Sequence, residues 1–221
     1  MSVERLVCIS DTHNRHEELD LPDGDVLVHA GDFTMRGSAE ETRAFAEWFL
    51  ARPHRHKVLV AGNHDRLFEE SPDEARALFG GVHYLQDSGV ELEGVAFWGS
   101  PWQPEFGGWA FNLPVGAPLA ERWALAPDGV DVLVTHVPPA GLMDRIVTGE
   151  SIGCAELTKA LPRIAPRLHV FGHVHECNGV HVAEPSPLSV NAASCDERYR
   201  FAHRPVVVER GADGYRVVDT P

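Results

Sequence analysis

Cysteine is scarce in this chain of 221 residues, and its spacing fits neither a zinc ribbon nor a disulfide framework. The four cysteines, Cys8, Cys154, Cys177 and Cys195, are widely separated, and no Cys-x-x-Cys pair occurs. We therefore expect them to be reduced. Cys8 lies within an apolar segment, which predicts a position in the core.

Basic residues are also few. The chain has 19 lysines and arginines against 33 aspartates and glutamates, which gives a formal net charge of -14. Duplex nucleic acid and anionic membranes normally require a basic surface, so neither is an expected partner. A small anionic substrate remains compatible with this charge if bound metal ions supply positive charge locally.

Long hydrophobic runs are absent as well. No segment approaches the length of a membrane span, and residues 1–5 lack a basic and then apolar leader, so we expect a cytoplasmic protein. Hydrophobic residues make up 43% and charged residues 24%, as in soluble globular proteins. The length suits one large domain over residues 1–221.

What the chain does contain is a series of apolar runs that each end in polar residues. Runs typical of buried strands are residues 5–10, 25–30, 57–61, 131–135 and 168–171. Short strands at 82–85, 90–92 and 95–98 suggest a meander that begins a second half-sheet. Further strands are expected at 188–192, 205–209 and 215–218, the last two joined by a turn at 211–214.

Helices are expected between these runs. Ser38-Ala39-Glu40-Glu41 is a capping box, and Ala44, Phe45, Trp48 and Phe49 behind it form one apolar stripe. Ser71 followed by Pro72 predicts a second helix start, and residues 118–126 and 154–164 have helical character. Alternating strands and helices predict an α/β fold.

Five strand ends carry residues that bind metals, namely Asp11, His13, Asp32, Asn63, His136, His173 and His175. A single histidine has an ordinary structural explanation, but ligands gather where the carboxyl ends of strands line one edge of an α/β sheet. Oxygen and nitrogen donors without thiolate suit Mn, Fe, Zn, Co or Ni. Seven candidates are too many for one tetrahedral ion, but they suit two ions that share a carboxylate, for which we choose Asp32.

Two of the motifs place metal-binding residues two positions apart, Asp11-Thr12-His13 and His173-Val174-His175. Residues at this spacing project to the same side of an extended segment. We therefore expect each pair to hold one ion.

Gly62-Asn63-His64-Asp65 combines three chemical groups directly after a strand. The amide of Asn63 can bind a metal, the imidazole of His64 can donate a proton at neutral pH, and the carboxylate of Asp65 can orient that imidazole. Gly62 would let the backbone pass close to the ions. Taken alone, the stretch has a second interpretation as an ordinary polar turn.

The loop at residues 101–112 is rich in aromatic rings. Trp102, Phe106 and Trp109 could form a wall for a planar group such as a nucleobase, because stacking tolerates any base. The alternative is an apolar cluster that covers the edge of the sheet.

With these motifs in view, the chain resembles the calcineurin-like metallophosphoesterases. Their motifs occur here in order as Asp11-Thr12-His13, Gly31-Asp32, Gly62-Asn63-His64-Asp65, His136 and Gly172-His173-Val174-His175. The resemblance implies a four-layer αββα sandwich of two mixed sheets flanked by helices. It also implies that Asp11, His13, Asp32 and His175 hold the first ion, and that Asp32, Asn63, His136 and His173 hold the second.

Met35 departs from the family pattern, because many members have Asp or Tyr three positions after the aspartate of the second motif. This departure argues against the tyrosine-ligated site of purple acid phosphatases. Gly31-Asp32-Phe33-Thr34, Pro101-Trp102 and residues 190–194 look instead like the MPPED subgroup, which is similar to bacterial class III cyclic nucleotide phosphodiesterases.

The resemblance implies hydrolysis of a small phosphoester by a hydroxide that bridges two divalent or trivalent metal ions, with Mn as first choice and His64 as proton donor. A phosphodiesterase, with cyclic nucleotides among its candidate substrates, is the first expectation. A phosphomonoesterase acting on a small phosphorylated metabolite or nucleotide would use the same ions and remains open. A noncatalytic scaffold could lose ligands or the motif histidine, and this chain has kept them. The acidic charge disfavours a DNA-processing nuclease.

Overall fold

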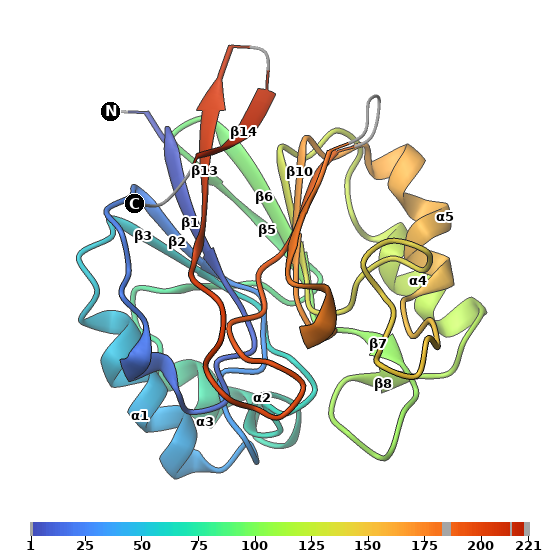
Figure 1. Ribbon diagram of the computed structural model, residues 1–221, viewed down its shortest axis with the longest axis horizontal. Helices are drawn as coiled ribbons and strands as arrows, with labels where there is room; N and C mark the ends of the chain where they lie inside the picture. The colour runs from blue at the N-terminus through green and yellow to red at the C-terminus, as the bar shows by residue number, and fades with distance from the viewer. Residues whose placement is uncertain (1, 183–186, 213, 219–221) are drawn as a thin grey trace.

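Two six-stranded sheets face each other in the computed structural model, which describes residues 2–182, 187–212 and 214–218 (Figure 1). The first has the order β14-β13-β1-β2-β3-β4 and consists of β1 (Arg5–Ile9), β2 (Val26–His29), β3 (His56–Leu59), β4 (His83–Tyr84), β13 (Val206–Gly211) and β14 (Gly214–Val218). Strands β1 to β4 are parallel, and β13 pairs antiparallel with both β1 and β14.

The second sheet has the order β11-β12-β10-β9-β6-β5. It consists of β5 (Ser88–Leu92), β6 (Val95–Ser100), β9 (Val132–Thr135), β10 (Leu168–Phe171), β11 (Gly179–His181) and β12 (Leu188–Asn191). Its four central strands are parallel, and both edge strands are antiparallel to their neighbours. Each sheet therefore directs several strand carboxyl ends toward one edge.

Helices cover the outer faces of both sheets (Figure 1). The first sheet carries α1 (Ala39–Leu50), α2 (Leu67–Glu70) and α3 (Pro72–Ala77), and the second carries α4 (Ala117–Ala124) and α5 (Ala155–Ile164). The predicted capping box is present at α1, where the Ser38 hydroxyl accepts a hydrogen bond from the Glu41 amide. The predicted four-layer αββα sandwich is confirmed.

Three apolar clusters fill the three spaces between the four layers. Alternate residues of β1 divide between two of them: Leu6 and Cys8 face the second sheet, whereas Val7 and Ile9 face α1. The third cluster joins the second sheet to α4 and α5 through residues such as Trp123. The period-two alternation of buried strands thus supplies both faces of each sheet.

Several details differ from the predictions. β4 belongs to the first sheet, where it pairs with β3, so the expected meander that begins the second sheet consists only of β5 and β6. Ala44 is exposed on α1, and Ala46 takes its place in the buried stripe. Ser71 precedes α3 without a side-chain cap. In the predicted turn at 211–214, Asp213 lies outside the described residues.

The aromatic loop contains two short strands that sequence periodicity does not reveal. β7 (Gln103–Pro104) and β8 (Asn112–Leu113) pair in parallel as a separate two-stranded sheet. The loop between them is held at both ends, which fixes where its aromatic rings lie.

The cysteines agree with the sequence prediction. All four are free; Cys8, Cys154 and Cys195 are buried, and burial raises the pKa of Cys8 to about 12. Within the described parts of the chain, no helix is both long and apolar enough to cross a membrane.

Candidate metal centre

The carboxyl ends of strands from both sheets meet at one edge of the sandwich. Asp11 and His13 follow β1, Asp32 follows β2, Asn63 follows β3, His136 follows β9, and His173 and His175 follow β10. A bridge between Ser10 and Ala193 joins the two sheets at this edge. All seven predicted ligands are brought together, and they form two adjoining groups.

The first group is Asp11, His13 and His175. The two imidazole Nε2 atoms lie 3.1 Å apart, and Nε2 of His175 is 3.3 Å from Oδ1 of Asp11. Ligands about 2.1 Å from one ion lie about 3.0 to 3.4 Å from each other at tetrahedral or octahedral angles. These spacings suit a shared ion.

The second group is Asp32, His136 and His173, joined by the amide oxygen of Asn63. Oδ1 of Asn63 lies 3.0 Å from Nε2 of His136 and 2.9 Å from Nδ1 of His173. Nε2 of His136 is 3.4 Å from Oδ2 of Asp32. These distances also suit ligands that share one ion.

Asp32 lies between the groups. Its Oδ2 atom is 3.4 Å from His136 in one group and 3.9 Å from His13 in the other. Its Oδ1 atom accepts a hydrogen bond from the backbone amide of His64 at 2.7 Å, which fixes the carboxylate. The position suits a shared ligand.

The outward nitrogens of three candidate ligands are tied to backbone carbonyls. Nδ1 of His13 pairs with Thr34 O at 3.2 Å, Nδ1 of His136 with Ala30 O at 2.9 Å, and Nδ1 of His175 with Asp196 O at 2.8 Å. A carbonyl only accepts, so each Nδ1 carries the proton and each Nε2 faces the centre, as in metal-binding histidines. The donor set therefore fits two metal ions.

The electrostatics are those of a cation site. Burial opposes ionisation of Asp32, yet the neighbouring imidazole of His136 holds the pKa of that carboxyl well below its usual range. Burial also opposes charge on His136, but Asp32 outweighs it and raises the pKa of His136 to about 9. His175 behaves in the same way beside Asp11, with a pKa of about 9. The two carboxylates thus stabilise the protonated, positively charged form of the nearest histidines.

The backbone at the centre is strained. Asp11, His13, Asp32 and His173 have φ values of 51°, 41°, 57° and 68°, in the left-handed region that residues other than glycine rarely adopt. Such strain clusters at functional sites. The left-handed backbone also means that residues 11–13 and 173–175 are not extended, contrary to expectation. The expectation that His173 and His175 hold the same ion is wrong, because they belong to different groups.

Two motif glycines allow close approach of the backbone. A Cβ on Gly62 would collide with Oδ1 and N of Asp32 and lie 2.7 Å from Cε1 of His136. A Cβ on Gly172 would collide with Oδ2 of Asp11. Any larger residue at either position would displace a candidate ligand.

His64 stands beside the two groups with its ring fixed from both ends. Nδ1 is 2.7 Å from Met35 O, so it donates its proton there, and Nε2 faces Asp32 Oδ2 at 3.9 Å. The indole of Trp109 stacks on the imidazole, with centroids 4.1 Å apart and planes inclined by 27°. Met35, the residue that departs from the family pattern, thus contributes its backbone carbonyl, which accepts the hydrogen bond from His64.

Asp65 does not orient His64 as predicted. Its carboxylate accepts hydrogen bonds from the amides of Gly62 and Asp32 at 2.7 and 2.8 Å, and from the amide and hydroxyl of Thr34 at 3.0 and 2.8 Å. Burial and the charge of Asp32 raise the pKa of Asp65 to about 7, while the four donors favour its ionised form. Asp65 fastens the loop after β2 to the loop after β3.

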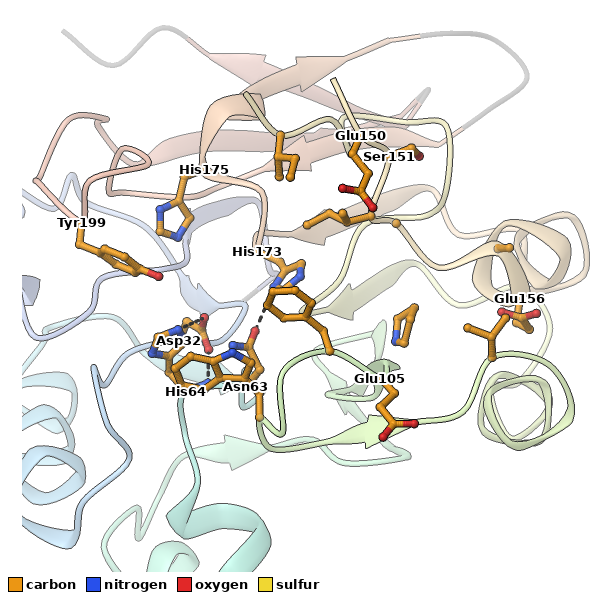
Figure 2. A pocket seen from close by; sticks show the side chains of 18 residues that line it. Asp32, Asn63, His64, Glu105, Glu150, Ser151, Glu156, His173, His175 and Tyr199 are labelled. Carbon is orange, nitrogen blue, oxygen red and sulfur yellow. Dashed lines mark hydrogen bonds and ion pairs between the residues drawn. The ribbon is translucent and has the colours of Figure 1, made fainter. Parts of the chain in front are cut away.

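A cavity of about 550 Å³ opens beside the centre, as Figure 2 shows. Of the predicted aromatic wall, Phe106 and Trp109 line it. Trp102 does not: its indole donates to Asp87 at 2.8 Å and packs edge-on against Phe111. Trp102 follows the alternative interpretation, a packing role, because its N–H finds a partner away from the site.

Tyr199 and three glutamates of the cavity escape sequence reasoning. The ring of Tyr199 lies 4.8 Å from that of His13 and 5.4 Å from that of His175. It lies outside every strand end, and Arg15 holds its loop through Tyr199 O at 2.6 Å. Glu105, Glu150 and Glu156 also line the cavity. No periodicity or motif marks these positions.

Comparisons with known proteins agree with this geometry. A family model described as calcineurin-like phosphoesterase matches residues 4–177, which include every candidate ligand. Human metallophosphoesterase domain-containing protein 1 is 41% identical over 230 residues, covering 93% of this chain and 70% of that protein.

Two solved structures share the fold at low sequence identity. TT1561 of Thermus thermophilus has a TM-score of 0.60 and 16% identity, covering 86% of this chain and 89% of that chain. The phosphopantetheinyl hydrolase of Mycobacterium tuberculosis has a TM-score of 0.59 and 18% identity, covering 90% of this chain and 92% of that chain.

Proposed function

The chain belongs to the calcineurin-like phosphoesterase family, and from that premise we propose that it is a dinuclear metal-dependent phosphodiesterase. The observation that carries the proposal is the pair of donor groups that adjoin at Asp32. Asp11, His13, Asp32 and His175 would hold one ion, and Asp32, Asn63, His136 and His173 the other. Manganese is our first choice, and Fe, Zn, Co or Ni suit the same donors.

When bound, the two ions supply positive charge to the phosphate oxygens and lower the pKa of a water molecule. The chain's own residues do the rest. Asn63 directs its Oδ1 atom into the second group, which leaves its amide nitrogen free to donate to a phosphate oxygen as negative charge develops.

We propose that His64 donates a proton to the leaving group. Its Nδ1 proton is already committed to Met35 O, so the proton donated to the departing oxygen comes from Nε2 of the imidazolium form, in which both ring nitrogens carry a proton. The ring is buried and held by Trp109, which reduces the number of orientations it can adopt. Asp65 acts indirectly, because it holds together the two loops that carry Asp32 and His64.

A diester is the preferred substrate class, and the centre opens into a cavity. The volume of about 550 Å³ beside the donors gives room for an organic group of the substrate. The choice of a diester over a monoester rests on the resemblance to the MPPED subgroup. Cyclic nucleotides remain candidates within this class. The complete ligand set argues against a noncatalytic scaffold.

Purified protein should be loaded with Mn and assayed with bis-p-nitrophenyl phosphate, p-nitrophenyl phosphate, 2′,3′-cyclic AMP and 3′,5′-cyclic AMP. We expect bis-p-nitrophenyl phosphate to give a higher kcat/KM than the monoester. Preference for p-nitrophenyl phosphate would replace the diesterase proposal with a phosphomonoesterase. No turnover with any metal would favour the scaffold.

The acidic charge of -14 supports a small-molecule phosphoester substrate over duplex nucleic acid or a membrane. Four free cysteines support the cytoplasm, where thiols stay reduced.

A further inference from the structure

The cavity beside the centre combines apolar and acidic side chains. Figure 2 shows it between two loops, one carrying Glu105 and the other carrying Glu150 and Ser151. Its apolar surface comes from Phe106, Trp109, Val115, Ile146 and Ile152. An organic group with an apolar body would therefore find contacts on both loops.

Away from the candidate metal centre, where His175 also lines the cavity, its charged side chains are all acidic. Glu105, Glu150 and Glu156 line the cavity, and Asp32 lies where the cavity meets the metal centre. No lysine or arginine occurs among the described residues that line it. Glu156 lies at the end away from Asp32 (Figure 2), so the negative charge continues beyond the reach of the centre.

The glutamates are available to a ligand. Within the described parts of the chain, no side-chain hydrogen bond or ion pair engages Glu105 or Glu150. Glu156 is only 6% exposed; its carboxylate accepts a weak hydrogen bond from Cys154 Sγ at 3.9 Å and lies 3.8 Å from Nζ of Lys159, whose side chain is 76% exposed. An ion pair with so exposed a partner is weak. The cavity thus keeps unneutralised negative charge beside an apolar surface.

We propose that this cavity binds the organic group of a phosphodiester when that group has an apolar body and a positively charged nitrogen. The inference rests on the proposed function, which places the phosphate on the metal ions. The carboxylates attract the cation, and the exposed ring of Phe106 attracts it further through its face. A substrate whose organic group carries a second negative charge is disfavoured, because no lysine or arginine among the described residues lines the cavity to neutralise it.

Three diesters with the same p-nitrophenol leaving group test the charge preference. They are p-nitrophenyl phosphorylcholine, its neutral isostere 3,3-dimethylbutyl p-nitrophenyl phosphate, and the anionic 4-carboxybutyl p-nitrophenyl phosphate. In each, water attacks phosphorus, the bond from phosphorus to the nitrophenyl oxygen breaks, and p-nitrophenolate leaves. We expect kcat/KM to fall roughly fivefold from cation to neutral ester, and at least as much again to the anion.

Neutralising variants identify the residues responsible. In the double variant Glu105→Gln/Glu150→Gln the ratio of the choline ester to its neutral isostere should fall toward one. Glu91→Gln, which removes an exposed carboxylate from β5 away from the cavity, should leave that ratio unchanged. An unchanged ratio in the double variant, or an equal loss in Glu91→Gln, would overturn the assignment.

A binding measurement without turnover separates this inference from the proposed function. Protein loaded with Zn, a diamagnetic ion, should be titrated with phenyltrimethylammonium and with benzenesulfonate by ligand-observed NMR. We expect the cation to bind, the anion not to bind, and the double variant to bind the cation several-fold more weakly. Such binding in a protein without phosphoesterase activity would reject only the proposed function. Hydrolysis of bis-p-nitrophenyl phosphate with equal kcat/KM for the three esters would reject only the cavity proposal.

Discussion

His64 is held by three parts of the chain that lie far apart in sequence. Its backbone follows β3, its Nδ1 atom bonds to Met35 O after β2, and its ring stacks on Trp109 from the loop between β7 and β8. Arg66 adds to the stack, since its guanidinium lies 5.3 Å from the indole centroid and donates to Gly108 O. Trp109 therefore positions the residue that we assign as proton donor.

Replacing Trp109 should affect the leaving-group step more than metal binding. In Trp109→Leu we expect kcat to fall about tenfold for a diester with an alkyl leaving group, and much less for p-nitrophenyl esters, which need little acid assistance. Trp109→Phe should retain most activity because an aromatic face remains. Equal losses for both leaving groups would mean that Trp109 acts on binding and not on His64.

At the level of elements, the carboxyl ends of the strands determine where the candidate ligands lie. Each of the parallel strands β1, β2, β3, β9 and β10 is short and largely buried, and each is followed within four residues by a candidate ligand. The motif glycines then allow loops from the two sheets to touch. The centre is consequently sensitive to a single added methyl group.

Gly62→Ala tests this sensitivity. The new Cβ would collide with the backbone and carboxylate of Asp32, so we expect metal affinity and activity to fall sharply and stability to fall by about 1 to 3 kcal/mol. Gly80→Ala is the matched control, because no atom lies within 4 Å of its added Cβ. Metal titration and denaturant unfolding of both variants measure the difference. A functional, fully loaded Gly62→Ala protein would contradict the packing described here.

The features that could be predicted from sequence have a local pattern, whereas the features that were missed depend on tertiary contacts. Apolar runs such as residues 131–135 indicate a buried strand, and the polar residue that follows indicates a site, so all seven candidate ligands that the structure brings together could be chosen from sequence. Tyr199 and Glu150 reach the cavity only through tertiary contacts of loops. The prediction for Asp65 was wrong because adjacency in sequence does not reveal that its four donors lie on two loops. β4, with two residues, carries too little pattern to assign a sheet.

At the scale of the whole molecule, the metal centre joins the two sheets at one edge while an apolar cluster joins them along their faces. The core between the sheets contains residues of both, including Val28, Val134 and Val170. We therefore propose that residues 1–221 unfold as one cooperative unit whose stability depends on bound metal.

Thermal unfolding should show one transition that shifts upward with added Mn. Binding to the folded state alone stabilises it by about 2.7 kcal/mol at a free metal concentration one hundred times Kd. Asp32→Ala should lose most of the shift, whereas His64→Asn should keep it. Two separate transitions would contradict a single unit, and an equal shift in Asp32→Ala would contradict its shared-ligand position.

The most direct test of a dinuclear phosphoesterase is metal content and turnover measured on the same samples. Wild-type protein, Asp32→Ala and His64→Asn should each be loaded with Mn, quantified for bound metal per chain, and assayed with bis-p-nitrophenyl phosphate. We predict two ions and turnover in the wild type, loss of both in Asp32→Ala, and two ions with reduced turnover in His64→Asn. Full turnover in Asp32→Ala with normal metal content would contradict the account.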